Sequence, residues 1–290
     1  MTDVLDGLEG DWEVIFVDDG SLDGSYPFMV ELHRRDPRFK VALLSRDFGV
    51  EISRTAGLDL AAGEAVITMD GDLQHPPEVI PDLVARWGEG NEVVWGVMTE
   101  RQGETWFRRA MTSLSHRMIR RLTKVDLPRG AGDFRLVDRR VLEAFNAMRE
   151  SNRYVRGMFR WIGFRQAVVP YVCPPRPAGR TKFGSRRLFR LGADAVVGFS
   201  HVPLRLALGA GFIVSLGSIA LGVSAAITKL LGGFTVPGFS SIMVLVGIVG
   251  GFQLIVLGVI GEYIGRIHDE VKRRPLYLVS ETHGLSDRLP

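Results

Sequence analysis

The chain has 290 residues, enough for one sizeable domain and a smaller part, and its single cysteine, Cys173, excludes an internal disulfide and is typical of a reducing compartment. A net charge of +3 and a pI near 9.2 are compatible with a nucleic-acid partner. The basic residues instead gather beside two uncharged stretches near the C-terminus, so we expect anionic lipid as the partner and no nucleic acid.

The first half of the chain alternates short apolar runs with amphipathic stretches. The runs predict strands at 12–17, 40–45, 65–70 and 92–97. The stretches between and after them predict helices at 26–35, 52–63, 76–87 and 104–124, the last of them long and basic. A short strand and helix (134–148), a helical stretch (153–164) and a strand (166–172) follow. This alternation is typical of an α/β domain with a mostly parallel sheet.

Acidic side chains follow two of these strands. Asp18 and Asp19 come directly after the first, and Asp70 and Asp72 flank a glycine after the third. Because ligands of parallel sheets bind beyond the carboxyl ends of the strands, we expect both acid groups at one edge. Adjacent carboxylates repel unless a cation neutralises them, and Mg²⁺ or Mn²⁺ does so while also binding phosphate oxygens. The sequence therefore predicts a site for a metal ion and a diphosphate.

The C-terminal part contains two uncharged stretches, 206–228 and 230–261, separated by Lys229. The turn sequence "GGFTVPG" breaks the second stretch near its start. Each is long enough for a helix that crosses a bilayer. The alternative is a pair of buried helices in a soluble domain. The preceding segment, 184–201, has apolar residues at helical spacing opposite arginines, which favours a helix in the membrane interface over an ordinary surface helix.

Charge on either side of these stretches predicts their orientation. Arginines and lysines precede the first span and follow the second, so both chain ends are expected in the cytoplasm. The acidic N-terminus has no apolar core and does not resemble a signal peptide. We therefore expect a cytoplasmic domain (1–183), an interfacial helix (184–201), a transmembrane hairpin (202–264) and a cytoplasmic tail (265–290).

Several ordered motifs carry a family resemblance. They are "VDDGS", "LSRDFG", "TAGLDLAAGEAVITMDGDLQHPPEVIP", "GDFRLVDRRV" and "RPAGRTKF", followed by the two spans and "RPLYLV". Together they resemble the polyprenyl-phosphate glycosyltransferases of family two, of the dolichol-phosphate mannosyltransferase and bactoprenol glucosyltransferase type. The resemblance implies a type A glycosyltransferase fold. It also implies inverting transfer of one sugar from a nucleotide-diphosphate sugar, expected to be a UDP-sugar, to undecaprenyl or dolichyl phosphate at the inner membrane, for cell-envelope glycans.

The resemblance also assigns roles to matching residues. It implies that the metal ion is held by Asp70, Asp72 and Gln74, with Asp72 catalytic, and that the nucleotide sugar is contacted by Asp18, Asp19 and Asp70. It implies that the lipid phosphate is bound by Arg108, Arg109, Arg135, Arg176 and Lys182. Asp133 would orient the acceptor or act as a base, although an ion pair with Arg135 that only supports a loop is an equal alternative.

Two departures from the family pattern matter most. Family members have a strand resembling "VVPVYNE", which would lie centrally in the sheet and help bind the nucleobase. No such segment precedes the strand at 12–17 in this sequence. Met98 stands where an arginine is common, and Arg101 is a possible substitute. The departures support a second hypothesis, an inactive relative that serves as a lipid-phosphate-binding scaffold. A third is a soluble nucleotide-sugar enzyme.

Glycine pairs in the second span, Gly247 with Gly251 and Gly261 with Gly265, would allow close helix contacts, and we expect a homo-oligomer.

Overall fold

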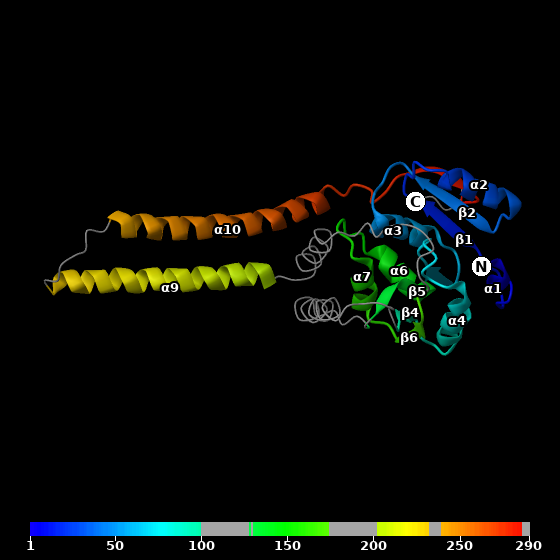
Figure 1. Ribbon diagram of the computed structural model, residues 1–290, viewed down its shortest axis with the longest axis horizontal. Coiled ribbons are helices and arrows are strands. Elements are labelled where there is room, and N and C mark those ends of the chain that lie inside the picture. The colour runs from blue at the N-terminus through cyan, green and yellow to red at the C-terminus, as the bar shows by residue number, and fades with distance from the viewer. Residues whose placement is uncertain (100–127, 129, 174–201, 232–238, 286–290) are drawn as a thin grey trace. The chain divides into compact units, whose positions relative to one another are not determined.

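The structure is a computed structural model, and the residues it describes are 1–99, 128, 130–173, 202–231 and 239–285 (Figure 1). The chain forms two compact units. The first comprises Met1–Gly184 together with Arg274–Pro290, and the second comprises Ser185–Arg273.

The first unit is an α/β domain, as the alternating sequence pattern predicts. Its strands are β1 (Val14–Asp18), β2 (Phe39–Leu44), β3 (Ala65–Thr68), β4 (Val93–Met98), β5 (Ala131–Asp138), β6 (Gln166–Tyr171) and β7 (Val279–His283). Its helices are α1 (Thr2–Leu5), α2 (Ser25–Arg35), α3 (Val50–Leu60), the 3₁₀ turn η1 (Pro77–Val79), α4 (Ile80–Gly88), α6 (Arg139–Ala147) and α7 (Val155–Ile162).

The described strands form two sheets, with the orders β1-β2-β7 and β3-β5-β4-β6. β1 pairs with β2, and β4 with β6, in parallel. The other three pairs are antiparallel, because β7 runs against β2 and β5 runs against both β3 and β4. The prediction of a mostly parallel sheet is therefore wrong for the described strands. An apolar run fixes the burial of a strand but not its direction, which depends on the neighbours with which it pairs.

Helix α3 contacts strands of both sheets, β1 and β3. Each of these strands has a neighbour on one side only among the described strands. Apolar residues of the N-terminal segment, including Leu5 and Trp12, join the same hydrophobic cluster as Val14 of β1 and Ile67 of β3. Among the described strands, no pairing joins β1 to β3.

The described part of the expected C-terminal tail, 265–285, has regular structure in both units. The last helix continues to Val271, and β7 then adds an edge to the first sheet. Tyr277 anchors the approach to β7, because its hydroxyl donates to Asp59 on α3 over 2.9 Å. The C-terminal residues thus belong to the α/β unit.

The second unit contains two long apolar helices, α9 (Val202–Leu230) and α10 (Phe239–Val271), which contact each other. Both are long and apolar enough to cross a membrane, over Ala207–Ser224 and Leu245–Val271. Gly211 of α9 lies against the ring of Phe252 of α10, where an added Cβ would come within 3.4 Å. The glycines named for oligomer contacts are not in such close packing, since a Cβ at any of Gly247, Gly251, Gly261 or Gly265 would meet nothing within 4 Å.

A glycine contact fixes how β4 packs on β5, the strand that carries Asp133. A Cβ at Gly96 would come within 2.8 Å of the buried Phe134 ring. We expect Gly96→Ala to lower the free energy of unfolding by about 1–3 kcal/mol through overpacking, measured by denaturant unfolding in detergent. Gly132→Ala on β5 is the matched control, because a Cβ there meets nothing within 4 Å. Equal effects of the two substitutions would contradict this account.

Candidate active site

The loop after β3 carries the predicted metal-binding acids. Its turn is held by side chain to backbone hydrogen bonds, in which the Asp72 carboxylate accepts from the amide of Gln74 over 3.1 Å. The Asp70 amide donates to Nδ1 of His75 over 2.9 Å. The Asp70 carboxylate is 39% exposed. The loop therefore has a fixed turn that leaves an acidic group accessible.

His75 is a structural residue of this loop. Its ring is buried, stacks on Phe134 with 5.0 Å between centroids and meets the edge of the Tyr171 ring. Burial lowers the pKa of His75, although the nearby carboxylates of Asp70 and Asp72 act in the opposite direction. A neutral ring matches its role as the acceptor for the Asp70 amide, because Nδ1 must then be unprotonated.

Asp133 on β5 lies at the centre of a group of arginines from three elements. Its carboxylate accepts from Arg135 over 3.0 Å and from Nε of Arg156 on α7 over 2.8 Å. Nη1 of Arg54 on α3 lies 3.2 Å from the same carboxylate. The side chain of Asp133 is only 8% exposed, so these charges interact with little solvent screening. Its backbone carbonyl also accepts from the Thr68 hydroxyl, which joins β5 to the end of β3.

The arginines keep Asp133 ionised. Burial alone would raise the pKa of Asp133, but the hydrogen bond and charge of Arg156, with the charges of Arg54 and Arg135, hold it well below its usual range. Arg135 has no exposed surface, and burial lowers its pKa to about 10. Its guanidinium lies about 5 Å from the Trp95 and Phe159 rings, at 4.9 and 5.0 Å, which compensates part of the lost hydration.

The second acid group consists of Asp18 and Asp19, whose carboxylates accept hydrogen bonds from backbone amides. Asp18 is 2% exposed and accepts from the amide of Ser21 over 2.6 Å. Asp19 accepts from the amides of Phe48 and Gly49, at 2.8 and 2.9 Å, and so holds the N-terminus of α3. Among the described residues, no hydrogen bond or ion pair joins this pair to Asp70 or Asp133. The two acid groups are linked through α3, because Asp19 holds the N-terminus of this helix and Arg54 lies on it.

The structure thus brings together three of the predicted site residues, Asp70, Asp133 and Arg135. Four predicted phosphate ligands and the interfacial helix lie outside the described residues, namely Arg108, Arg109, Arg176, Lys182 and 184–201. Sequence reasoning missed Arg54 and Arg156. Glu51 and Arg54 stand three positions apart on α3 and form a local pair at 3.6 Å. That spacing does not reveal the partners of Arg54 across the domain.

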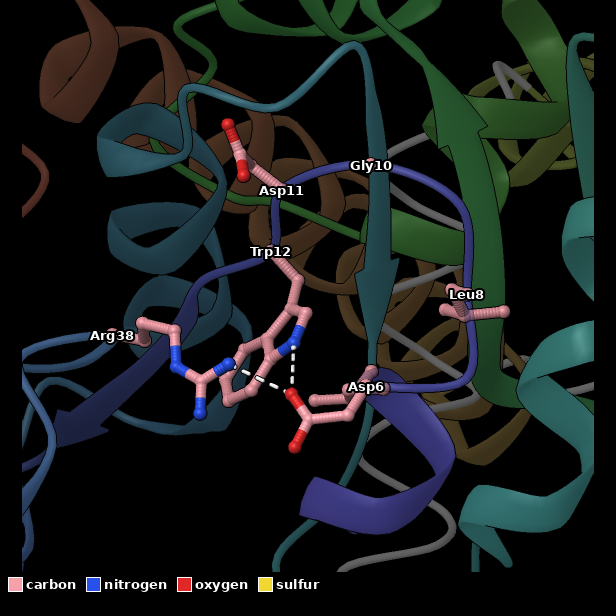
Figure 2. Close-up of a pocket in the computed structure, with 7 residues that line it drawn as sticks. Asp6, Leu8, Gly10, Asp11, Trp12 and Arg38 are labelled. Carbon is pink, nitrogen blue, oxygen red and sulfur yellow. Dashed lines mark hydrogen bonds and ion pairs between the residues drawn. The ribbon is translucent and has the colours of Figure 1, made fainter.

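A surface hollow lies elsewhere, beside the N-terminal segment (Figure 2). Arg38 stacks over the Trp12 ring at 3.8 Å, and both side chains donate to the Asp6 carboxylate. None of the predicted site residues lines this hollow. Its contacts anchor the N-terminal segment.

Comparison with known proteins gives the family. Residues 1–145 match Glycosyl transferase family 2. Glycosyltransferase YkcC of Bacillus subtilis (strain 168) is 41% identical over 288 residues, covering 99% of this chain and 89% of that protein. The SfII prophage-derived bactoprenol glucosyl transferase of Shigella flexneri is 36% identical, covering 93% of this chain and 88% of that protein. The chain belongs to glycosyl transferase family 2.

Among solved structures, the mannosyltransferase PcManGT from Pyrobaculum calidifontis, in complex with GDP-Man and Mn²⁺, covers 89% of this chain and 78% of its own, with 15% identity and a TM-score of 0.40.

The charge balance around Asp133 makes a stability prediction. Asp133→Asn leaves the guanidinium of Arg135 buried with less compensating charge, and we expect a loss of about 3–5 kcal/mol in the free energy of unfolding near neutral pH. Denaturant unfolding in detergent measures it, with Asp82→Asn on the exposed face of α4 as control.

Because the folded pKa of Asp133 is lowered, the carboxylate stabilises the fold above its unfolded pKa of about 3.9, and this stabilisation is lost as pH falls through the folded pKa. The difference between the native chain and Asp133→Asn should stay constant from pH 8 to 5 and shrink below about pH 4. A difference that already disappears near pH 6 would contradict the assignment.

Proposed function

We propose that this glycosyltransferase moves a single sugar from a nucleotide-diphosphate sugar, expected to be a UDP-sugar, to a polyprenyl phosphate, with inversion at the anomeric carbon. The product would be a polyprenyl-phosphate sugar for cell-envelope glycans. The relatives named bactoprenol glucosyl transferases support the acceptor. The observation that carries the proposal is the ion pair of Arg54 with both Asp70 and Asp133, which joins an acidic loop to a group of arginines.

The acidic loop has a donor set that fits a hard divalent cation. No group of three His, Cys, Asp or Glu side chains arranged for a metal ion is found within the described residues. Mg²⁺ usually takes one or two carboxylates and completes its shell with water and substrate phosphates, so Asp70 and Asp72 suffice as protein acids. Gln74 would supply an amide oxygen. A metal bound there would stabilise the charge that develops on the leaving diphosphate.

The acceptor side needs positive charge more than a base. A phosphate monoester is already anionic near neutral pH, so its attack on the anomeric carbon requires no strong base. Asp133, whose pKa is low, is a weak proton acceptor and suits the role of holding arginines in place. Arg135 is fully buried, whereas Arg156 is 37% exposed and is the arginine of this group best placed to meet a phosphate. The other basic ligands remain predictions from the sequence.

We propose that α9 and α10 span the inner membrane, with the α/β unit and both termini in the cytoplasm. Arginines and lysines before the first span and after the second support this orientation, since Lys229 is the only charged residue in the sequence between the spans. The protein should pellet with membranes and be released by detergent but not by salt or carbonate. Recovery in the supernatant after lysis would support the soluble-enzyme alternative and contradict this proposal.

Sugar transfer into extractable lipid tests the activity. Full-length protein in undecaprenyl-phosphate liposomes, with Mg²⁺ or Mn²⁺ and a panel of labelled UDP- and GDP-sugars, should label the lipid from one donor. Asp72→Ala should reduce the rate by about 100-fold or more, because the metal would lose a ligand. Asp82→Ala, which removes an exposed carboxylate from α4, should leave the rate unchanged.

Lipid labelling should also disappear with EDTA and return with added Mn²⁺. Absence of label from every donor, with protein that unfolds cooperatively, would contradict the proposal. The inactive scaffold would then be the better hypothesis, and it predicts binding of undecaprenyl phosphate without turnover.

A further inference from the structure

Arg54 holds a position that the reaction as proposed does not explain. Its side chain is 9% exposed and lies among three carboxylates. Nη2 is 3.1 Å from Asp70, and Nη1 is 3.2 Å from Asp133 and 3.6 Å from Glu51. A long cationic side chain is rarely buried unless it is paired, so these contacts fix its place.

The carboxylates on either side of Arg54 differ in how they are held. Asp133 has two further arginine partners, Arg135 and Arg156, and stays compensated without Arg54. The Asp70 carboxylate, in contrast, forms its salt bridge with Arg54 within the described part of the chain. A divalent cation that binds Asp70 must therefore share or displace this arginine.

We infer that Arg54 is a positioning residue that competes with the divalent cation for Asp70 and so makes cation binding depend on the donor diphosphate. This inference rests on the proposed function. Two cations at one carboxylate repel each other, which weakens binding of the free metal ion. The diphosphate brings negative charge to the same place and offsets that repulsion. The arginine freed from Asp70 remains bound to Asp133, which couples donor loading to the acceptor side.

The decisive measurement is the affinity of the protein in detergent for Mn²⁺ alone. The EPR signal of free Mn²⁺ reports how much of the ion is bound. Arg54→Met should bind Mn²⁺ at least about tenfold more tightly than the native chain, because a positive charge next to the carboxylate is removed. Arg54→Lys, which keeps the charge, should stay near the native affinity. Arg54→Gln provides the same neutral test if the methionine variant does not fold.

Two controls locate the effect. Arg86→Met removes an exposed arginine of α4 that pairs with Glu89, and should leave Mn²⁺ affinity unchanged. Asp70→Asn added to Arg54→Met should abolish the gain, because the gain is assigned to that carboxylate. Addition of UDP or GDP should tighten Mn²⁺ binding more in the native chain than in Arg54→Met.

Unchanged or weaker Mn²⁺ affinity in a folded neutral variant would overturn the inference, and so would absence of Mn²⁺ binding in all variants. These outcomes are separate from the sugar-transfer assay. Sugar transfer with no change in Mn²⁺ affinity would leave the proposed function standing and refute the role of Arg54. Tighter Mn²⁺ binding in a protein that transfers no sugar would support the role of Arg54 and refute the function.

Discussion

The pairing of the buried Asp133 carboxylate with three arginines is the interaction on which the site depends. A carboxylate that is 8% exposed and a guanidinium with no exposed surface are costly to desolvate, and each requires the other. The arginines come from α3, β5 and α7, so satisfying one charge fixes three elements relative to one another. The site geometry is a consequence of this charge compensation.

The same constraint explains how a divided sheet can support one site. β1 and β3 belong to separate sheets, and α3 contacts both. Asp19, which follows β1, holds the N-terminus of α3, and Arg54 on the same helix pairs with Asp70. β7, from the C-terminal part of the chain, pairs with β2 and forms one edge of the first sheet. Sequence-distant segments thus set the positions of the acidic side chains.

Much of the local structure was predictable. Apolar runs located the strands from β1 to β6, and periodic stretches located α2, α3 and α4, because burial of one face imposes a period on the sequence. The two apolar helices were visible as uncharged stretches. Strand direction was not predictable, and β5 shows why. Its sequence indicates a buried strand, but hydrogen bonds to β3 and β4 decide that it runs against both.

The sequence by itself determined the family resemblance, the acids Asp70, Asp72 and Asp133, and two helices able to cross a membrane, because these depend on residue type and local spacing. Tertiary structure alone decided that Arg54 meets Asp70 and Asp133 and that Arg156 meets Asp133. Arg54 and Arg156 stand 79 and 23 positions from Asp133 in the chain. Only the packing of α3 and α7 around β5 brings their charges into contact, since electrostatic partners are chosen by distance in space.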